Sequence, residues 1–190
     1  FSSGCSPKLK VTARQTPHYY IYEDINLAHM EDWVQTDIHV PPGAIVAIMA
    51  QGKIRYMPEG WEVDPPFCLR FRIGKYGREI FLRSGQDKDF TTNVNIVKIF
   101  RDGPLYFSIG RNYPQPSLFK SFLKATVIVW PKECETHIHE DIITLKENRP
   151  DLRRQIGIFP FLLPECYYLS GEYEKAEKLL HPLRRYAWKN

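Results

Sequence analysis

The chain has 190 residues, of which 43% are hydrophobic and 14% aromatic, so it can bury a core and is not predominantly disordered. It carries 26 basic and 22 acidic residues, a formal net charge of +4, with no long lysine or arginine run and no recognised nucleic-acid motif. This pattern argues against nucleic acid as a partner. No stretch approaches the roughly 18 apolar residues of a membrane-spanning helix.

The first residues, FSSGCSPK, place small side chains directly before Cys5. This pattern resembles the lipobox of bacterial lipoproteins, in which the cysteine carries lipid, although Ser2 stands where that pattern prefers leucine. The resemblance implies lipidation of Cys5 and an anchor that holds the protein at a membrane surface without spanning it. A linker of small residues is the alternative interpretation. We expect residues 1–18, which are mostly polar, to form an N-terminal tether.

Short strand-like segments then alternate with turn signals. Residues 18–28 are dense in aromatic and β-branched side chains, and residues 44–50 form the continuous apolar run typical of a buried strand. Residues 67–73 alternate between apolar and other side chains, as in a strand with one buried face, and a further apolar run covers residues 97–100. Strands at spacings of about 8 to 12 residues predict an all-β sandwich over residues 19–131.

Residues 132–190 are richer in charge and in helix formers. They predict a short helix at residues 141–148 and another that begins at Pro150. The clearest helical segment is residues 172–188, whose apolar residues recur at three- and four-residue spacing. Pro182 should kink that helix, because proline removes an amide donor and clashes with the preceding turn.

The segment LPECYYLSGEYEKAEKLL, residues 163–180, resembles a tetratricopeptide hairpin. The residues that match the packing positions of that family are Tyr167, Leu169, Gly171, Tyr173 and Ala176. A single repeat cannot bury its own face, so either the hairpin caps the sandwich or further repeats follow. An ordinary helical hairpin is the alternative.

Residues 32–130 resemble the galactose-binding-like jelly roll of PA-IL-type lectins, a calcium-dependent sugar-binding family. The matching segments, in chain order, are VPPGAIVAIMAQGKIRYMP, LRFRIGKYGREIFLRSG, DGPLYFSIGRN and FLKATVIVW. The expected fold is therefore mainly β with a C-terminal α segment: a β-sandwich over residues 19–131, followed by a tetratricopeptide-like helical hairpin within residues 132–190.

The resemblance implies a calcium site built from oxygen donors, which this sequence largely lacks. Tyr56 matches the family's early tyrosine, whose backbone oxygen is a ligand. Where the family has an aspartate, this chain has Gly110, Arg111 and Asn112, and no carboxylate occurs between Gly103 and Glu133. Calcium takes six to eight oxygens, usually including carboxylates. We therefore expect no cofactor, with calcium as the disfavoured alternative.

The segment CETHIHE contains the residue types that hold zinc. These candidates are Cys134, His137, His139 and Glu140. Their spacing matches no standard motif, and solvated histidines are the favoured interpretation. The four cysteines of the chain include no CxxC pair and allow three disulfide pairings, with separate thiols as the favoured alternative. Motifs such as GxSxG and HExxH are absent, so we expect no enzyme.

Exposed aromatic residues are the stronger candidates for contact with a partner. Trp61 and Tyr113 lie in predicted rim loops and Tyr76 in a predicted hairpin turn, where rigid rings can stack on a sugar or anchor a protein. Sealing the ends of the sandwich is the alternative role. The candidate contact residues are Tyr56, Trp61, Arg111, Asn112, Tyr113 and Lys120.

The favoured function is a non-catalytic binding or assembly module of a bacterial cell envelope, periplasmic or outer-membrane-associated. It would dock envelope proteins, with a lipid anchor at Cys5. The alternative is a carbohydrate-binding lectin, and the third hypothesis is a metal-dependent enzyme that uses the cluster at residues 134–140.

Overall fold

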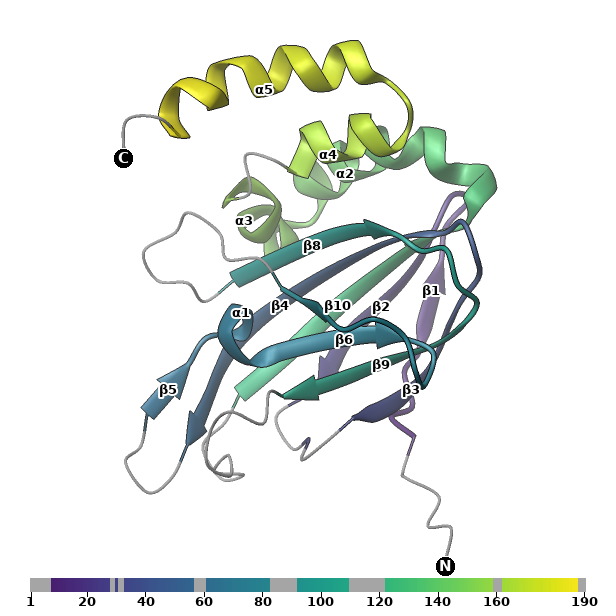
Figure 1. The fold of residues 1–190 in the computed structure, drawn as a ribbon, viewed down its shortest axis with the longest axis vertical. Helices are drawn as coiled ribbons and strands as arrows, with labels where there is room; N and C mark the ends of the chain where they lie inside the picture. The colour runs from purple at the N-terminus through teal and green to yellow at the C-terminus, as the bar shows by residue number, and fades with distance from the viewer. Residues whose placement is uncertain are drawn as a thin grey trace, which may run out of the picture.

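The computed structural model describes residues 8–27, 30, 33–56, 61–82, 92–109, 122–158 and 162–187. These residues form two antiparallel sheets and a C-terminal helical segment, so the expectation of a mainly β chain with helices at its end is confirmed (Figure 1). None of the helices in these ranges has the length and apolar content needed to cross a membrane.

The larger sheet has six strands in the order β1-β2-β10-β4-β5, with β8 also paired to β4. Its strands are β1 (Ala13–Gln15), β2 (Tyr20–Asn26), β4 (Ile45–Tyr56), β5 (Trp61–Val63), β8 (Thr92–Lys98) and β10 (Phe122–Trp130). The strands β8 and β5 pair with successive stretches of β4, at residues 45–51 and 54–56. The edge of β4 that faces away from β10 is therefore paired with β8 along residues 45–51 and with β5 along residues 54–56.

The smaller sheet has four strands in the order β3-β9-β6-β7. They are β3 (Val34–Val40), β6 (Leu69–Ile73), β7 (Ile80–Phe81) and β9 (Gly103–Ile109). The predicted alternation is seen in β6, where Leu69, Phe71 and Ile73 are buried and the two arginines between them are half-buried. Residues 65–68, partly expected as strand, instead form the short helix α1 (Pro65–Cys68), because proline fits the first turn of a helix, where no amide donor is needed.

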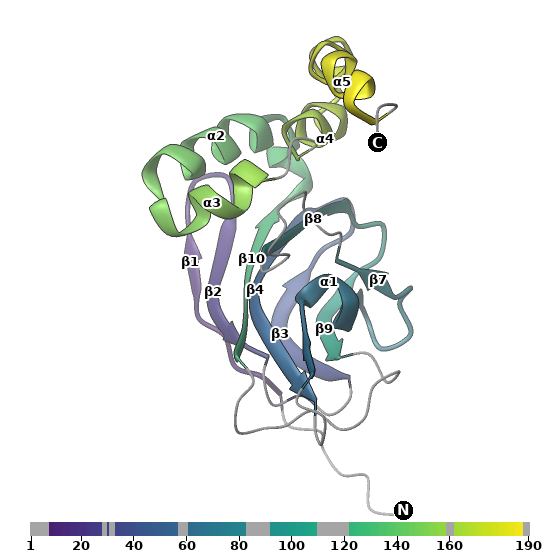
Figure 2. The same ribbon diagram turned by 90° about the vertical axis from the view of Figure 1, so that its left-hand side faces the viewer.

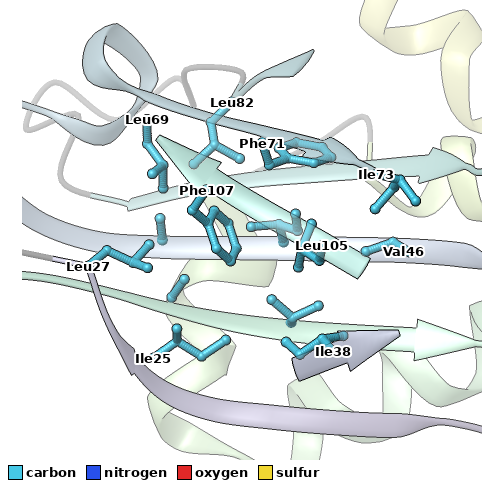
Figure 3. Close-up of a cluster of buried hydrophobic side chains, with 14 of the residues drawn as sticks. Ile25, Leu27, Ile38, Val46, Leu69, Phe71, Ile73, Leu82, Leu105 and Phe107 are labelled. Atoms are coloured by element: carbon cyan, nitrogen blue, oxygen red, sulfur yellow. The ribbon is translucent and has the colours of Figure 1, made fainter. Parts of the chain in front are cut away.

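One apolar core lies between the two sheets. It combines residues of the smaller sheet, such as Leu69, Phe71 and Phe107, with Ile25 and Val46 of the larger sheet (Figure 3). Burial of apolar surface contributes about 25 cal/mol for each Å² removed from water, so this shared core holds the two sheets together.

A second core lies between the other face of the larger sheet and the helices. The helical elements are the 3₁₀ helix η1 (Lys132–His137), α2 (Ile138–Asn148), α3 (Pro150–Ile158), α4 (Leu162–Leu169) and α5 (Tyr173–Ala187). Side chains of α2, α3 and α4 pack with Ile45, Ala47 and Met49 of β4, and the helices lie together at one end of both views (Figure 1, Figure 2). Because β4 is covered on both faces, its sequence is a continuous apolar run instead of an alternating one.

The helices agree with the sequence expectations in position. The helix expected at residues 141–148 begins three residues earlier, at Ile138, and the next begins at Pro150 as predicted. The segment expected at 172–188 is helical over Tyr173–Ala187, and Pro182 lies inside it without ending it.

Within the described part of the expected tether, residues 8–18, the stretch 8–15 is attached to both sheets. Leu9 donates its amide hydrogen to Gln35 O at 2.9 Å and makes a bridge to Thr36 of β3, and β1 pairs with β2. The chain therefore passes from the β3 edge of the smaller sheet to the β1 edge of the larger one, and joins the sheets on that side.

Candidate docking groove

On the side away from residues 8–15, the edges of the two sheets leave an open groove. Here β7 ends the smaller sheet and β8 borders the larger one (Figure 2). The groove has a volume of about 880 Å³ and is lined by residues 73, 76–81 and 97–101. We call it the β7–β8 groove.

One wall of the groove is the turn between β6 and β7. Gly74 has a φ of 75°, and the amide of Gly77 donates to Gly74 O at 3.1 Å. Glycine reaches such positive φ angles without a steric penalty. The tight turn places Tyr76 at its tip with 83% of its surface exposed, so the prediction of an exposed turn tyrosine is confirmed.

The other wall follows the end of β8. Ile99 is buried and is fixed by two backbone hydrogen bonds to the turn before β4: its amide donates to Ala44 O at 2.8 Å, and its carbonyl accepts from Gly43 at 2.7 Å. The next residue, Phe100, is 81% exposed. Phe100 is thus an exposed aromatic ring that directly follows a backbone position held by these hydrogen bonds.

Aliphatic side chains form the floor. Ile73 and Ile99 are buried in the core, and Ile80 and Val97 pack against it while still lining the groove. Phe81 is 54% exposed. Its carbonyl accepts a 2.9 Å hydrogen bond from the Nδ2 of buried Asn95, which ties β7 to β8. The groove thus has an apolar floor between two fixed strand edges.

The charges on the groove are mostly positive. Glu79 is paired with Arg70 at 2.8 Å, and Lys98 with Glu135 at 2.6 Å, so these two lining residues are already neutralised by neighbours. Arg78 and Arg101 are exposed, and within the described ranges neither makes an ion pair. The groove therefore presents a free guanidinium group on each of its two walls.

Most of the lipidation and contact residues proposed from the sequence fall where the structure gives no description. Cys5, Arg111, Asn112, Tyr113 and Lys120 lie outside the described residues. Tyr56 and Trp61 are cross-strand partners in the β4–β5 pair. Trp61, which was expected in a rim loop, is therefore the first residue of a short strand.

The four metal candidates do not form a described metal site. His137 stacks on His18 with ring centroids 4.0 Å apart, whereas His139 lies against Tyr167 and has Nδ1 3.1 Å from Glu172 Oε1. In the part of the chain that the structure describes, no group of three or more histidine, cysteine, aspartate or glutamate side chains is placed to hold a metal ion.

The thiol of Cys134 is half-buried in η1. Partial burial, with Glu133 and Asp141 nearby, raises the pKa of Cys134 above its ordinary value. The three described cysteines, Cys68, Cys134 and Cys166, are free thiols.

Sequence reasoning identified Tyr76 but missed the rest of the groove. Phe100 was expected at the end of an apolar strand run, whereas β8 ends at Lys98 and Phe100 is exposed. The Asp-Gly pair at residues 102–103 was the available signal, because this dipeptide often marks the end of a strand. No local sequence pattern indicates that β7 and β8 lie on opposite sides of a groove.

Comparison with known proteins yielded no matching family model and no matching curated protein.

Proposed function

We propose that the chain is a non-catalytic binding module that docks a protein partner in the β7–β8 groove. The observation that carries this proposal is the pair of exposed rings, Tyr76 and Phe100, on opposite walls of a groove with an aliphatic floor. Binding energy at protein interfaces concentrates in a few aromatic and arginine residues around apolar pockets. The groove supplies both residue types on ordered strand ends.

The same groove favours a protein over a sugar. The buried centre of a protein interface is enriched in aromatic residues and arginine and depleted in acidic residues. Glu79 is the carboxylate among the lining residues, and it is engaged by Arg70. A lectin using Trp61, Tyr113 and their neighbours is the second candidate, supported by the PA-IL-like sequence pattern alone.

The fold relationship and the location form part of the proposal. Two antiparallel sheets around one core are compatible with a galactose-binding-like jelly roll, and α4 and α5, joined at Gly171, with a tetratricopeptide-like hairpin. The lipobox-like sequence at Cys5 supports attachment to a bacterial envelope, periplasmic or outer-membrane-associated, where envelope proteins would be the partners.

Site-specific photo-crosslinking in the host cell tests the proposal. A photoreactive phenylalanine analogue replaces Tyr76 or Phe100 in two variants, and exposed Lys146 of α2 in a third. We expect the same discrete protein adduct from the first two positions and not from the third. Equal adducts at all three positions, or none, would contradict docking in the groove. Glycan binding that is abolished by calcium chelation would favour the lectin instead.

A further inference from the structure

We propose that the occupant of the β7–β8 groove is an extended peptide segment of a protein partner, in which acidic side chains alternate with apolar ones. This inference rests on the proposed docking function and adds the chemistry of the ligand. It follows from three features of the groove: its unpaired charges, its apolar floor and the course of its two walls beside β7 and the end of β8.

The unpaired positive charges of the groove indicate that its ligand is negatively charged. Arg78 on one wall and Arg101 on the other lack an ion-pair partner among the described residues, whereas Glu79 and Lys98 are neutralised by Arg70 and Glu135. Lys75 adds a further exposed cation beside Tyr76, with its Nζ 5.6 Å from the ring centroid. A guanidinium group matches a carboxylate with two parallel hydrogen bonds. The groove is therefore complementary to acidic side chains along both walls.

The floor sets the apolar part of the ligand. Ile80, Val97 and Phe81 line the groove between the two charged walls and are continuous with the core. An aliphatic floor gains free energy by covering apolar side chains, at about 25 cal/mol for each Å² buried. A ligand with charged side chains alone would leave the aliphatic floor exposed to water.

The walls set the backbone conformation of the ligand. One wall is the turn before β7 and the other is the segment that follows β8, and the space between them runs along β7 and the end of β8. Along an extended chain, successive side chains point to opposite faces. A peptide in this conformation places alternate apolar residues on the floor and directs the acidic residues between them toward Arg78 and Arg101.

A single-stranded nucleic acid fits the groove less well. Nucleic-acid channels combine stacking rings with a continuous cationic track for successive phosphates. Here the lining combines Tyr76 and Phe100 with aliphatic residues, and it also includes Glu79, which is paired with Arg70. The same cations bind either polyanion at short range, so oligothymidylate is included in the test as a competitor.

Peptide selection on the 190-residue chain tests the inference. Random peptides displayed on phage are selected against the wild-type protein, and the enriched sequences are made as fluorescent probes for polarisation assays. We expect enrichment of acidic residues interleaved with apolar ones. In the double variant Arg78→Glu/Arg101→Glu, we expect the affinity for these probes to fall about tenfold or more. A new selection on that variant should yield basic peptides.

The matched control is Lys10→Glu/Lys146→Glu, which changes the formal charge equally at exposed sites outside the groove. We expect it to alter affinity less than about twofold, since charges far from the ligand are screened. Circular dichroism of both double variants checks that the fold is kept.

Three results would overturn the inference: no enrichment, enrichment without acidic residues, or displacement of the probes by oligothymidylate at lower concentration than by unlabelled peptide. If crosslinks still form at Tyr76 and Phe100 in any of these cases, the docking proposal stands and only the ligand chemistry is wrong. If crosslinks fail as well, both are wrong.

Discussion

The indole nitrogen of Trp130 donates a hydrogen bond to Oδ2 of Asp141 at 2.9 Å. Trp130 ends β10 and is fully buried, and Asp141 lies in the first turn of α2. The other carboxylate oxygen lies 3.0 Å from His18 Nδ1. One carboxylate thus joins α2 to β10 and to the segment before β2.

Loss of this carboxylate should destabilise the fold. In Asp141→Ala, the buried indole N–H of Trp130 loses its partner, and an unsatisfied buried donor costs about 1–3 kcal/mol. Asp141→Asn retains an acceptor for the indole and should cost less. Urea unfolding at neutral pH measures both, with Lys146→Ala as the exposed control on the same helix. Equal stability of Asp141→Ala and the wild type would show that the hydrogen bond makes no net contribution to the free energy of unfolding.

A second link between the sheet and the helices is Arg149, whose stabilising effect should depend on pH. Its guanidinium group bonds Asp151 of α3, with Nε 2.9 Å from Oδ1, and also contacts Glu23 of β2. The hydrogen bond from Arg149 lowers the pKa of Asp151, against the opposing effect of burial. A group with a lowered pKa in the folded state stabilises the fold above its ordinary pKa, and this contribution is lost as the pH falls through the folded value.

The loss of stability in Arg149→Ala should therefore be largest near neutral pH and should shrink below about pH 4, the ordinary range for aspartate. Because the Asp151 side chain is 57% exposed, we expect its share to be below about 1 kcal/mol. Urea unfolding of both proteins across this range measures the difference. A gap between them that is constant or grows on acidification would contradict the ion-pair account.

The buried thiols should be protected from alkylation in the folded protein. Burial is the main cause that raises the pKa of Cys68 to about 12, and burial also raises the pKa of Cys166. Because the thiolate is the reactive form, we expect both to be labelled by iodoacetamide near pH 8 only after unfolding. Cys134, which is partly exposed, should react first among the three described thiols.

Mass spectrometry of the labelled peptides assigns each site, and a Cys5→Ser variant removes the thiol outside the described ranges. Labelling of Cys68 at the rate of Cys134 in native protein would mean that the core opens far more often than its packing indicates.

Gly52 should tolerate no side chain. It has a φ of 112°, and a Cβ at this position would lie 2.0 Å from the carbonyl oxygen of Phe122 in the paired strand β10. We expect Gly52→Ala to cost at least about 2 kcal/mol, from backbone strain plus the clash. Gly171→Ala is the matched control, because Gly171 has a φ of 82° but a Cβ added there would meet no atom within 4 Å. Equal losses of stability in thermal unfolding would exclude the clash with Phe122 as the cause.

Periodicity was sufficient to predict the elements whose burial is regular along the chain. The alternation of Leu69, Phe71 and Ile73 identified β6 and its buried face, and the apolar stripe that includes Ala176 identified α5. These patterns succeed because they record which side of one element faces the core.

Relationships between distant segments were not predictable in the same way. The apolar run of β4 indicated a buried strand, but it did not indicate that the C-terminal helices cover one face and the smaller sheet the other. The attachment of Leu9 to β3 and the opposed edges of β7 and β8 depend on strand order, which is set by long-range packing. The candidate groove was missed for this reason, although its tip residue Tyr76 was recognised.

Residues 45–50 of β4 are buried on both faces, so this stretch lacks the polarity pattern that helps to fix the register of most strands, whereas Gln51 and Lys53 beyond it are exposed. In a strand with one wet face, a slip by one residue moves polar side chains into the core and is strongly penalised. In β4 such a slip would exchange one apolar set, such as Val46 and Ile48, for another, such as Ala47 and Met49. Gly52 disfavours such a slip by a steric clash, because the slip would bring the side chain of Gln51 or Lys53 against the Phe122 carbonyl. Gly52 therefore helps to fix the register of the β4–β10 pair.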